Sequence, residues 1–287
     1  MGSTTSKDVS KGYPSYAAYT PLDFELVCES LKTNQTLKSL DIGARCLKCR
    51  SDLKLLTDVL ISGNHALTKL YIMGISISTE GAQLLSDVLK KNKTITLLNI
   101  CHDDICNPGA QFLGEALEEN QTLTSLDISE NDINYSGSYF LFKALLKNRT
   151  LTDLNFRSNT IGDSGAIHLG QILKMNQVLS TIDVRYNDIG FQGTVHLYNG
   201  LKNNYSITSL QHSGRRDNIF VDKITDEVRY NKFGNKKLRY NIGRLLLYCH
   251  HFEHESLLYK DNLPLDIFKV IFKMSDAWYV PPFFDKN

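Results

Sequence analysis

The sequence is poor in several features that would mark particular classes of protein. Its 287 residues carry 32 basic and 31 acidic side chains, and it has one tryptophan and six prolines. A nucleic-acid-binding surface usually brings a basic excess, so this balance argues against a nucleic-acid partner. No apolar run approaches the roughly 18 residues that a transmembrane helix needs. Residues 1–20 are polar and lack the apolar core of a signal peptide, so we expect a cytoplasmic protein.

One nine-residue phrase recurs along most of the chain. It reads NQTLKSLDI from Asn34 and NQTLTSLDI from Asn120, and a degraded copy, NYSITSLQH, starts at Asn204. Seven copies follow one another at steps of 30 and then 28 residues, starting at Asn34, Asn64, Asn92, Asn120, Asn148, Asn176 and Asn204. A fixed period of this length indicates a solenoid, in which each unit buries one face against the next.

Each unit combines a strand pattern with a helix pattern. Apolar residues at L-x-x-L-x-L spacing predict a short strand whose alternate side chains point inward. His212 occupies the last apolar position of the seventh copy and interrupts that column. An asparagine follows the best strands (Asn131, Asn159 and Asn187), where its amide can bond backbone groups left unpaired in the turn. A glycine and then helically spaced leucines follow, such as Leu113 with Leu117.

The stretch Leu-Asp-Ile-Ser-Glu-Asn-Asp-Ile (126–133), the 28-residue period and the strand-plus-helix unit resemble leucine-rich repeats of the ribonuclease-inhibitor class. The repeat domains of NOD-like receptors and Ran GTPase-activating proteins are of the same class. The resemblance covers roughly residues 22–215. It implies an α/β horseshoe with a concave parallel sheet, convex helices and, here, an α-helical C-terminal cap. The expected divisions are a flexible segment 1–20, a cap helix 21–36, repeats 37–215 and a helical region 216–287.

The six cysteines form no regular disulfide framework, so we interpret them as reduced thiols. Cys46 and Cys49 form a C-x-x-C pair, and Cys101, His102 and Cys106 lie two repeats further on. Adjacent strands are about 4.8 Å apart, which separates the two groups by roughly 10 Å and prevents them from sharing one ion. We therefore expect no metal and no cofactor.

The two ends of the chain suggest further properties. Met-Gly-Ser-Thr-Thr-Ser matches an N-myristoylation signal with Gly2 as acceptor, which is the only route to a membrane that we expect. Near the other end, Leu263-Pro264 with Asp266 and Ile267 resembles the opening of an F-box. Leu245 and Cys249 followed by 263–265 loosely resemble a SOCS box, from which Arg244 and Glu253 depart. These patterns leave open a role as substrate adaptor of a ubiquitin ligase.

The outward-facing positions of the strands are the candidate binding surface. Arg157, Arg185 and Tyr186 fall in adjacent repeats, and arginine and tyrosine are over-represented as interface anchors. Acidic and apolar residues lie toward the other end of the array. The candidate partner-binding residues are Tyr71, Met73, His102, Asp127, Glu130, Asn155, Arg157, Asp183, Arg185 and Tyr186.

No catalytic arrangement is apparent. There is no G-x-S-x-G, P-loop or H-E-x-x-H sequence, and His168 and His196 occupy equivalent positions in successive repeats. We therefore predict a monomeric, non-enzymatic module that binds an unidentified protein on its concave face. The Asn- and Lys-rich composition and the unrelated helical tail resemble translocated effectors of intracellular bacteria, which would act in the host cytoplasm. A Ran GTPase-activator-like regulator is a further alternative, implied by the repeat class alone.

Overall fold

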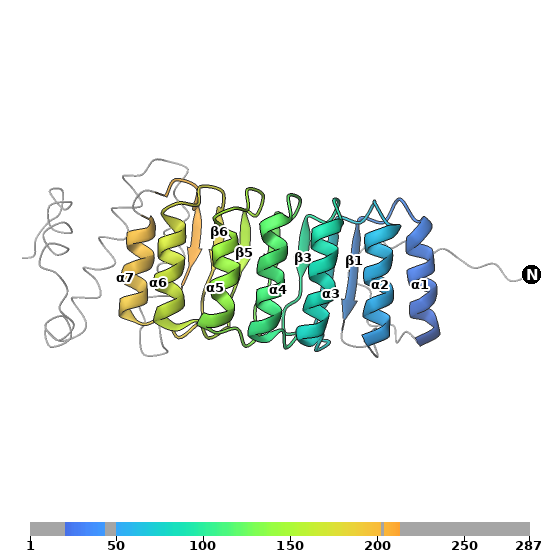
Figure 1. Ribbon diagram of the computed structural model, residues 1–287, viewed down its shortest axis with the longest axis horizontal. Coiled ribbons are helices and arrows are strands. Elements are labelled where there is room, and N and C mark those ends of the chain that lie inside the picture. The colour runs from blue at the N-terminus through green and yellow to red at the C-terminus, as the bar shows by residue number, and fades with distance from the viewer. Residues whose placement is uncertain (1–20, 44–49, 202–203, 213–287) are drawn as a thin grey trace, which may run out of the picture.

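The computed structural model describes residues 21–43, 50–201 and 204–212. Helices and strands alternate along this part of the chain, starting with a helix (Figure 1). The helices are α1 Pro21–Thr33, α2 Arg50–Ser62, α3 Ser78–Lys91, α4 Cys106–Glu119, α5 Tyr135–Ala144, α6 Gly162–Leu173 and α7 Phe191–Leu201. The strands are β1 Ser39–Gly43, β2 Lys69–Met73, β3 Leu97–Asn99, β4 Ser125–Asp127, β5 Asp153–Asn155, β6 Thr181–Asp183 and β7 Ser209–Gln211.

The strands form one parallel sheet in which the spatial order is the sequence order, β1 to β7. Equivalent residues of successive repeats are in register, so that Tyr71 lies opposite Asn99 and Asn99 lies opposite Asp127. The helices stand side by side in the same order and cover one face of this sheet (Figure 1). We call the opposite face, which none of the described helices covers, the strand face. This arrangement confirms the predicted α/β solenoid.

The core lies between the sheet and the helices, and the apolar columns of the repeat fill it. Leu70, Leu98, Leu126 and Leu154 are each at most 3% exposed, because alternate strand residues point toward the helices. The helical leucines at predicted spacing are buried too, among them Leu113 and Leu117 of α4 and Leu169 and Leu173 of α6. His212 does not leave its column, as the sequence pattern suggested, but is buried at 1% exposure.

The repeat glycines lie inside the first turn of the helices rather than ahead of them. Gly109, for example, is the fourth residue of α4 and is buried. A Cβ there would lie 2.6 Å from Cγ2 of Ile105 and 2.9 Å from Cβ of Ala82. The glycine is therefore required by the close approach of this helix to the preceding repeat, because any larger side chain would collide with it.

Several expectations concern segments outside the described residues. The N-terminal segment with Gly2, the C-x-x-C pair Cys46 and Cys49, and the C-terminal region 216–287 all lie there. The division of the chain at 20, 36 and 215 therefore stays a prediction. No helix in the described part of the chain is long and apolar enough to cross a membrane.

Candidate protein-interaction face

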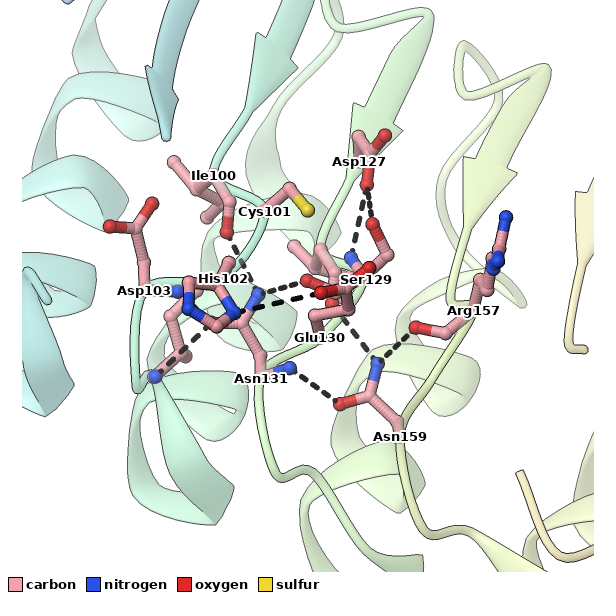
Figure 2. Close-up of polar contacts among 12 residues, drawn as sticks. Ile100, Cys101, His102, Asp103, Asp127, Ser129, Glu130, Asn131, Arg157 and Asn159 are labelled. Carbon is pink, nitrogen blue, oxygen red and sulfur yellow. Dashed lines mark hydrogen bonds and ion pairs between the residues drawn. The ribbon is translucent and has the colours of Figure 1, made fainter. Parts of the chain in front are cut away.

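A ladder of buried asparagines joins the loops that follow the strands (Figure 2). The Oδ1 atom of Asn131 accepts a hydrogen bond from the backbone N–H of Asp103 at 3.0 Å, and its Nδ2 donates to the carbonyl of Ile100 at 2.8 Å. Asn159 accepts in the same way from the N–H groups of Asn131 and Ile133. Each amide thus satisfies the turning backbone of the preceding repeat, as predicted, and fixes the spacing of adjacent loops.

At one equivalent position, the same loops place a residue of successive repeats in the left-handed backbone region. Tyr186 has φ of 55°, and the equivalent residues of the preceding repeats have φ between 53° and 66°, namely Ser158, Glu130, His102 and Gly74. Side chains larger than asparagine rarely adopt this conformation. The repeated backbone turn therefore imposes it, and His102, Glu130 and Tyr186 are all exposed there.

The middle of the strand face is acidic and internally hydrogen-bonded. The Oδ1 atom of Asp127 accepts from the N–H of Ser129 at 3.0 Å and from its hydroxyl at 2.6 Å. Its Oδ2 atom accepts from Nδ2 of Asn155 at 2.8 Å. One repeat earlier, Nδ1 of His102 lies 3.6 Å from a carboxylate oxygen of Glu130. The Asp127 carboxylate consequently has donors from the chain itself on both oxygens, whereas Glu130 lies near His102 without a hydrogen bond (Figure 2).

The next two repeats are basic and aromatic. The guanidinium carbon of Arg157 lies 4.8 Å from the ring centroid of Tyr186, within the range of a cation–π contact. Arg185 instead binds its near neighbour Asp183, with Nη2 to Oδ2 at 2.7 Å and Nε to Oδ1 at 3.1 Å. The two arginines are therefore not equivalent: one is held by an aromatic ring, and the other is neutralised by a carboxylate.

The register of the sheet relates the sequence-predicted residues to one another. Tyr71, Asp127, Asn155 and Asp183 lie in one row across the strand face. Met73, Arg157 and Arg185 lie two positions further along the chain, and His102, Glu130 and Tyr186 follow in the left-handed position. The geometry thus brings all ten onto one surface. Tyr71 and Met73 lie on β2, at the end of that surface farthest from Tyr186.

Asp103 was not among the predicted residues, although the sequence carried a signal for it. It occupies the ladder position where other repeats have asparagine, and it is fully buried. Its Oδ1 atom accepts from the N–H of Ile75 at 2.8 Å, but its buried Oδ2 atom has no partner among the described residues. Burial raises the pKa of this carboxyl to about 6. Hydrogen bonds from backbone N–H groups and the charge of His102 lower the pKa and offset this increase only in part.

His212 is the second buried ionisable group that the binding hypothesis does not include. Its Nε2 atom lies 2.7 Å from the hydroxyl of Thr194, which itself donates to the carbonyl of Gly190 at 2.8 Å. Because the hydroxyl proton is used in the hydrogen bond to Gly190, Nε2 of His212 carries a proton and donates a hydrogen bond to the Thr194 oxygen. Burial lowers the pKa of His212 to about 4, and Asp163 opposes this only in part. The imidazole is therefore neutral at physiological pH.

The described cysteines show no site chemistry. Cys28, Cys101 and Cys106 are free thiols, and burial raises the pKa of Cys28 to about 11 and that of Cys101 above its ordinary value. A raised pKa lowers the thiolate fraction and with it the reactivity. Within residues 21–43, 50–201 and 204–212, no group of three or more His, Cys, Asp or Glu residues could hold a metal ion.

Comparison with known families agrees with this architecture. Residues 119–140 and 147–170 match the family described as Leucine Rich repeat. The fold is a leucine-rich-repeat solenoid. Leucine-rich repeats generally serve as non-enzymatic protein-interaction folds. No curated protein sequence matches the chain.

Two solved leucine-rich-repeat-like structures are similar to the chain. One is "Leiomodin-1 Actin-Binding Site 2", at 19% identity and a TM-score of 0.40, covering 64% of this chain and 91% of that one. The other is the tropomodulin C-terminal domain of Caenorhabditis elegans, at 15% identity and a TM-score of 0.43, covering 64% and 93%. At these values neither likeness carries an argument about the partner of this chain.

Proposed function

We propose that this protein is a non-enzymatic module that binds a protein partner on its strand face, centred on Arg157 and Tyr186. The contact between these two residues carries the proposal. Tyr186 is 52% exposed although it is large and aromatic, and its backbone is held in the left-handed region by the repeat. An exposed aromatic ring on a rigid backbone loses little conformational entropy on binding, which is what interface anchors require.

The surroundings of this pair suit a specific rather than a purely apolar interface. Asp127 and Glu130 lie on one side, and the neutralised Arg185–Asp183 pair lies on the other. The surface changes from acidic to basic over successive repeats. Such an arrangement fixes the orientation of a partner with the opposite polarity, because the reversed orientation would place like charges together.

The decisive experiment compares two matched triple variants in affinity capture. One variant carries R157A, R185A and Y186A on the strand face. The control carries Y135A, K143A and R149A, which remove one aromatic and two basic side chains from exposed positions outside that face. Proteins retained by the wild type and the control but lost from the strand-face variant support the proposal. Equal retention by all three proteins contradicts it, provided that circular dichroism shows the variants to be folded.

We place the protein in the cytoplasm as a monomer, and we extend the proposal to a translocated bacterial effector acting on host proteins. The composition and tail noted in the sequence support this extension. Capture from host cytosol tests it: a host protein bound through the strand face is the expected result. Membrane association depends on myristoylation of Gly2, which intact-mass measurement after co-expression with an N-myristoyltransferase decides.

Two alternatives have their own discriminating measurements. A ubiquitin-ligase adaptor would bind elongin, Skp1 or cullin, and would lose that binding on deletion of residues 240–287, which lie outside the described part of the chain. A Ran-type GTPase-activator-like regulator would accelerate GTP hydrolysis by its GTPase. Loss of partner binding in the strand-face variant without either of these activities favours the simple binding module.

A further inference from the structure

Arg157 is a cation of the strand face that forms no ion pair with any described residue. Its side chain makes a contact with the Tyr186 ring, but its Nε atom is buried and has no hydrogen-bond partner among the described residues. In Figure 2 its guanidinium group points away from the asparagine ladder, and no dashed line reaches it. A guanidinium group carries five N–H donors in a planar fork, and leaving them desolvated without acceptors is costly.

No hydrogen bond or ion pair joins Arg157 to the neighbouring carboxylates among the described residues, and each of these carboxylates contacts another group. Asp183 is bound through both oxygens by Arg185. Asp127 accepts from Ser129 on one oxygen and from Asn155 on the other. Glu130 lies next to His102 in the opposite direction along the sheet. Arg157 therefore has no carboxylate partner among the described residues.

The surroundings of Arg157 also preorganise its guanidinium group for binding. The Tyr186 ring covers one face of the guanidinium group, which restricts its rotation and leaves the edge of the fork as the direction for hydrogen bonds. The fork matches the two oxygens of a carboxylate, and such pairs are shorter and stronger than neutral hydrogen bonds. A partner that places a carboxylate against the two Nη atoms, which are not among the buried atoms that lack a partner, adds a charge-assisted pair.

We propose that Arg157 is the receptor for an aspartate or glutamate side chain of the protein partner, held in a fork-to-carboxylate pair beside the Tyr186 ring. This inference deepens the proposed function and rests on it. It also assigns unequal roles to the two arginines. Arg157 recognises the partner's carboxylate, whereas Arg185 is already neutralised by Asp183 and serves to shape the surface.

The test uses a displayed library of random linear peptides selected on the full chain. Peptides recovered on the wild type are expected to share an acidic residue at one fixed position. R157Q is expected to weaken their binding by about tenfold or more, the value of one charge-assisted pair, and R157K should recover only part of it. R149Q, the matched control at an exposed position outside the strand face, should change binding by less than about threefold.

The possible outcomes separate the two proposals. Peptides that the R157A/R185A/Y186A variant no longer binds depend on the strand face. If such peptides share no acidic position, the carboxylate inference is overturned and the proposal of a binding module stands. Equal losses for R157Q and R149Q also overturn the inference. Binding that requires phosphoserine in a phosphorylated version of the library assigns Arg157 to phosphate instead. Failure to recover any peptide that depends on the strand face counts against both proposals.

Discussion

Asp103 accepts a hydrogen bond from the N–H of Ile75 at 2.8 Å, the same bond that Asn131 makes to the N–H of Asp103 one repeat later. The two side chains differ at their second polar atom. Nδ2 of Asn131 donates to the carbonyl of Ile100, whereas Oδ2 of Asp103 is buried and unpaired. The ladder thus contains one position at which a carboxyl replaces an amide, and its protonation state determines whether a donor is present.

We expect Asp103→Asn to stabilise the protein above pH 6. The folded-state pKa of Asp103 is raised to about 6 from 3.8, so the folded protein binds this proton more tightly than the unfolded chain does. The resulting stabilisation of the folded state is fully present below pH 3.8 and is lost as the pH rises through 6. The side-chain amide of asparagine supplies an N–H donor at every pH. Urea unfolding at pH 8 should therefore show a gain of about 1–3 kcal/mol for the variant, shrinking toward pH 4.

The reciprocal change, Asn131→Asp, is the control for this prediction. It places a carboxyl at an equivalent, 1% exposed ladder position. It should lower stability at pH 8 and lose that effect on acidification. A stability difference between Asp103→Asn and the wild type that stays constant from pH 4 to 8 would contradict our account of Asp103.

We expect the opposite pH response from His212. Its folded-state pKa is lowered to about 4 from 6.5, so the unfolded chain binds the proton more tightly. Stability contributed by the neutral imidazole is present above pH 6.5 and is lost as the pH falls toward 4. His212→Val, which copies Val184 of the preceding repeat, should remove this loss, worth about 1–3 kcal/mol at pH 4. Parallel stability–pH curves for variant and wild type would rule this out.

Gly170→Ala should destabilise the contact between α6 and α7. A Cβ at Gly170 would lie 2.4 Å from the carbonyl oxygen of His196, a backbone atom that cannot rotate away. We expect a loss of about 1–3 kcal/mol in the free energy of unfolding, the usual cost of overpacking. Gly43→Ala is the control, because a Cβ there meets nothing within 4 Å. The two variants should differ clearly in melting temperature, and similar melting temperatures would refute the close packing of these helices.

Asn148→Ala should cost more than Asn34→Ala. Oδ1 of Asn148 accepts from the N–H groups of Leu151 and Thr150, and its Nδ2 donates to the carbonyl of Leu117; the bonds to Leu151 and Leu117 are buried and the bond to Thr150 is partly buried. Its removal leaves buried backbone groups unpaired, at about 2–4 kcal/mol in total. Asn34 makes the same turn in an exposed position, where water replaces the lost bonds. Chemical denaturation of both variants measures the difference, and equal losses would count against burial as its cause.

The sequence predicted the fold well because the repeated apolar positions are the positions that are buried. Leu98 and Leu126 occupy the same position of successive strands. Because side chains alternate along a strand, only one register points both of them toward the helices. The positions of Arg157 and Tyr186 on one surface followed from the same register. Whether those residues bind a partner stays a prediction.

The finer geometry of the strand face was not predictable in the same way. That Arg185 turns to Asp183 while Arg157 turns to Tyr186 depends on side-chain rotamers and on competing acceptors, which spacing does not encode. The left-handed backbone at Tyr186 is likewise imposed by the loop rather than preferred by the residue. For Asp103 the signal was present, as an acid at an asparagine position, but its meaning depended on knowing that the position is buried.

The asparagines that open the repeats have a consequence for covalent modification. Asn92, Asn120, Asn148 and Asn204 each start an Asn-x-Ser/Thr sequence, the acceptor signal for N-linked glycans, yet each is at most 4% exposed. Their Nδ2 atoms, to which a sugar would be attached, donate to the carbonyls of Leu60, Leu89, Leu117 and Leu173. A glycan added to any of them before folding would remove one of these donors and place a bulky polar group between successive helices. The closed solenoid thus requires that these four asparagines carry no glycan.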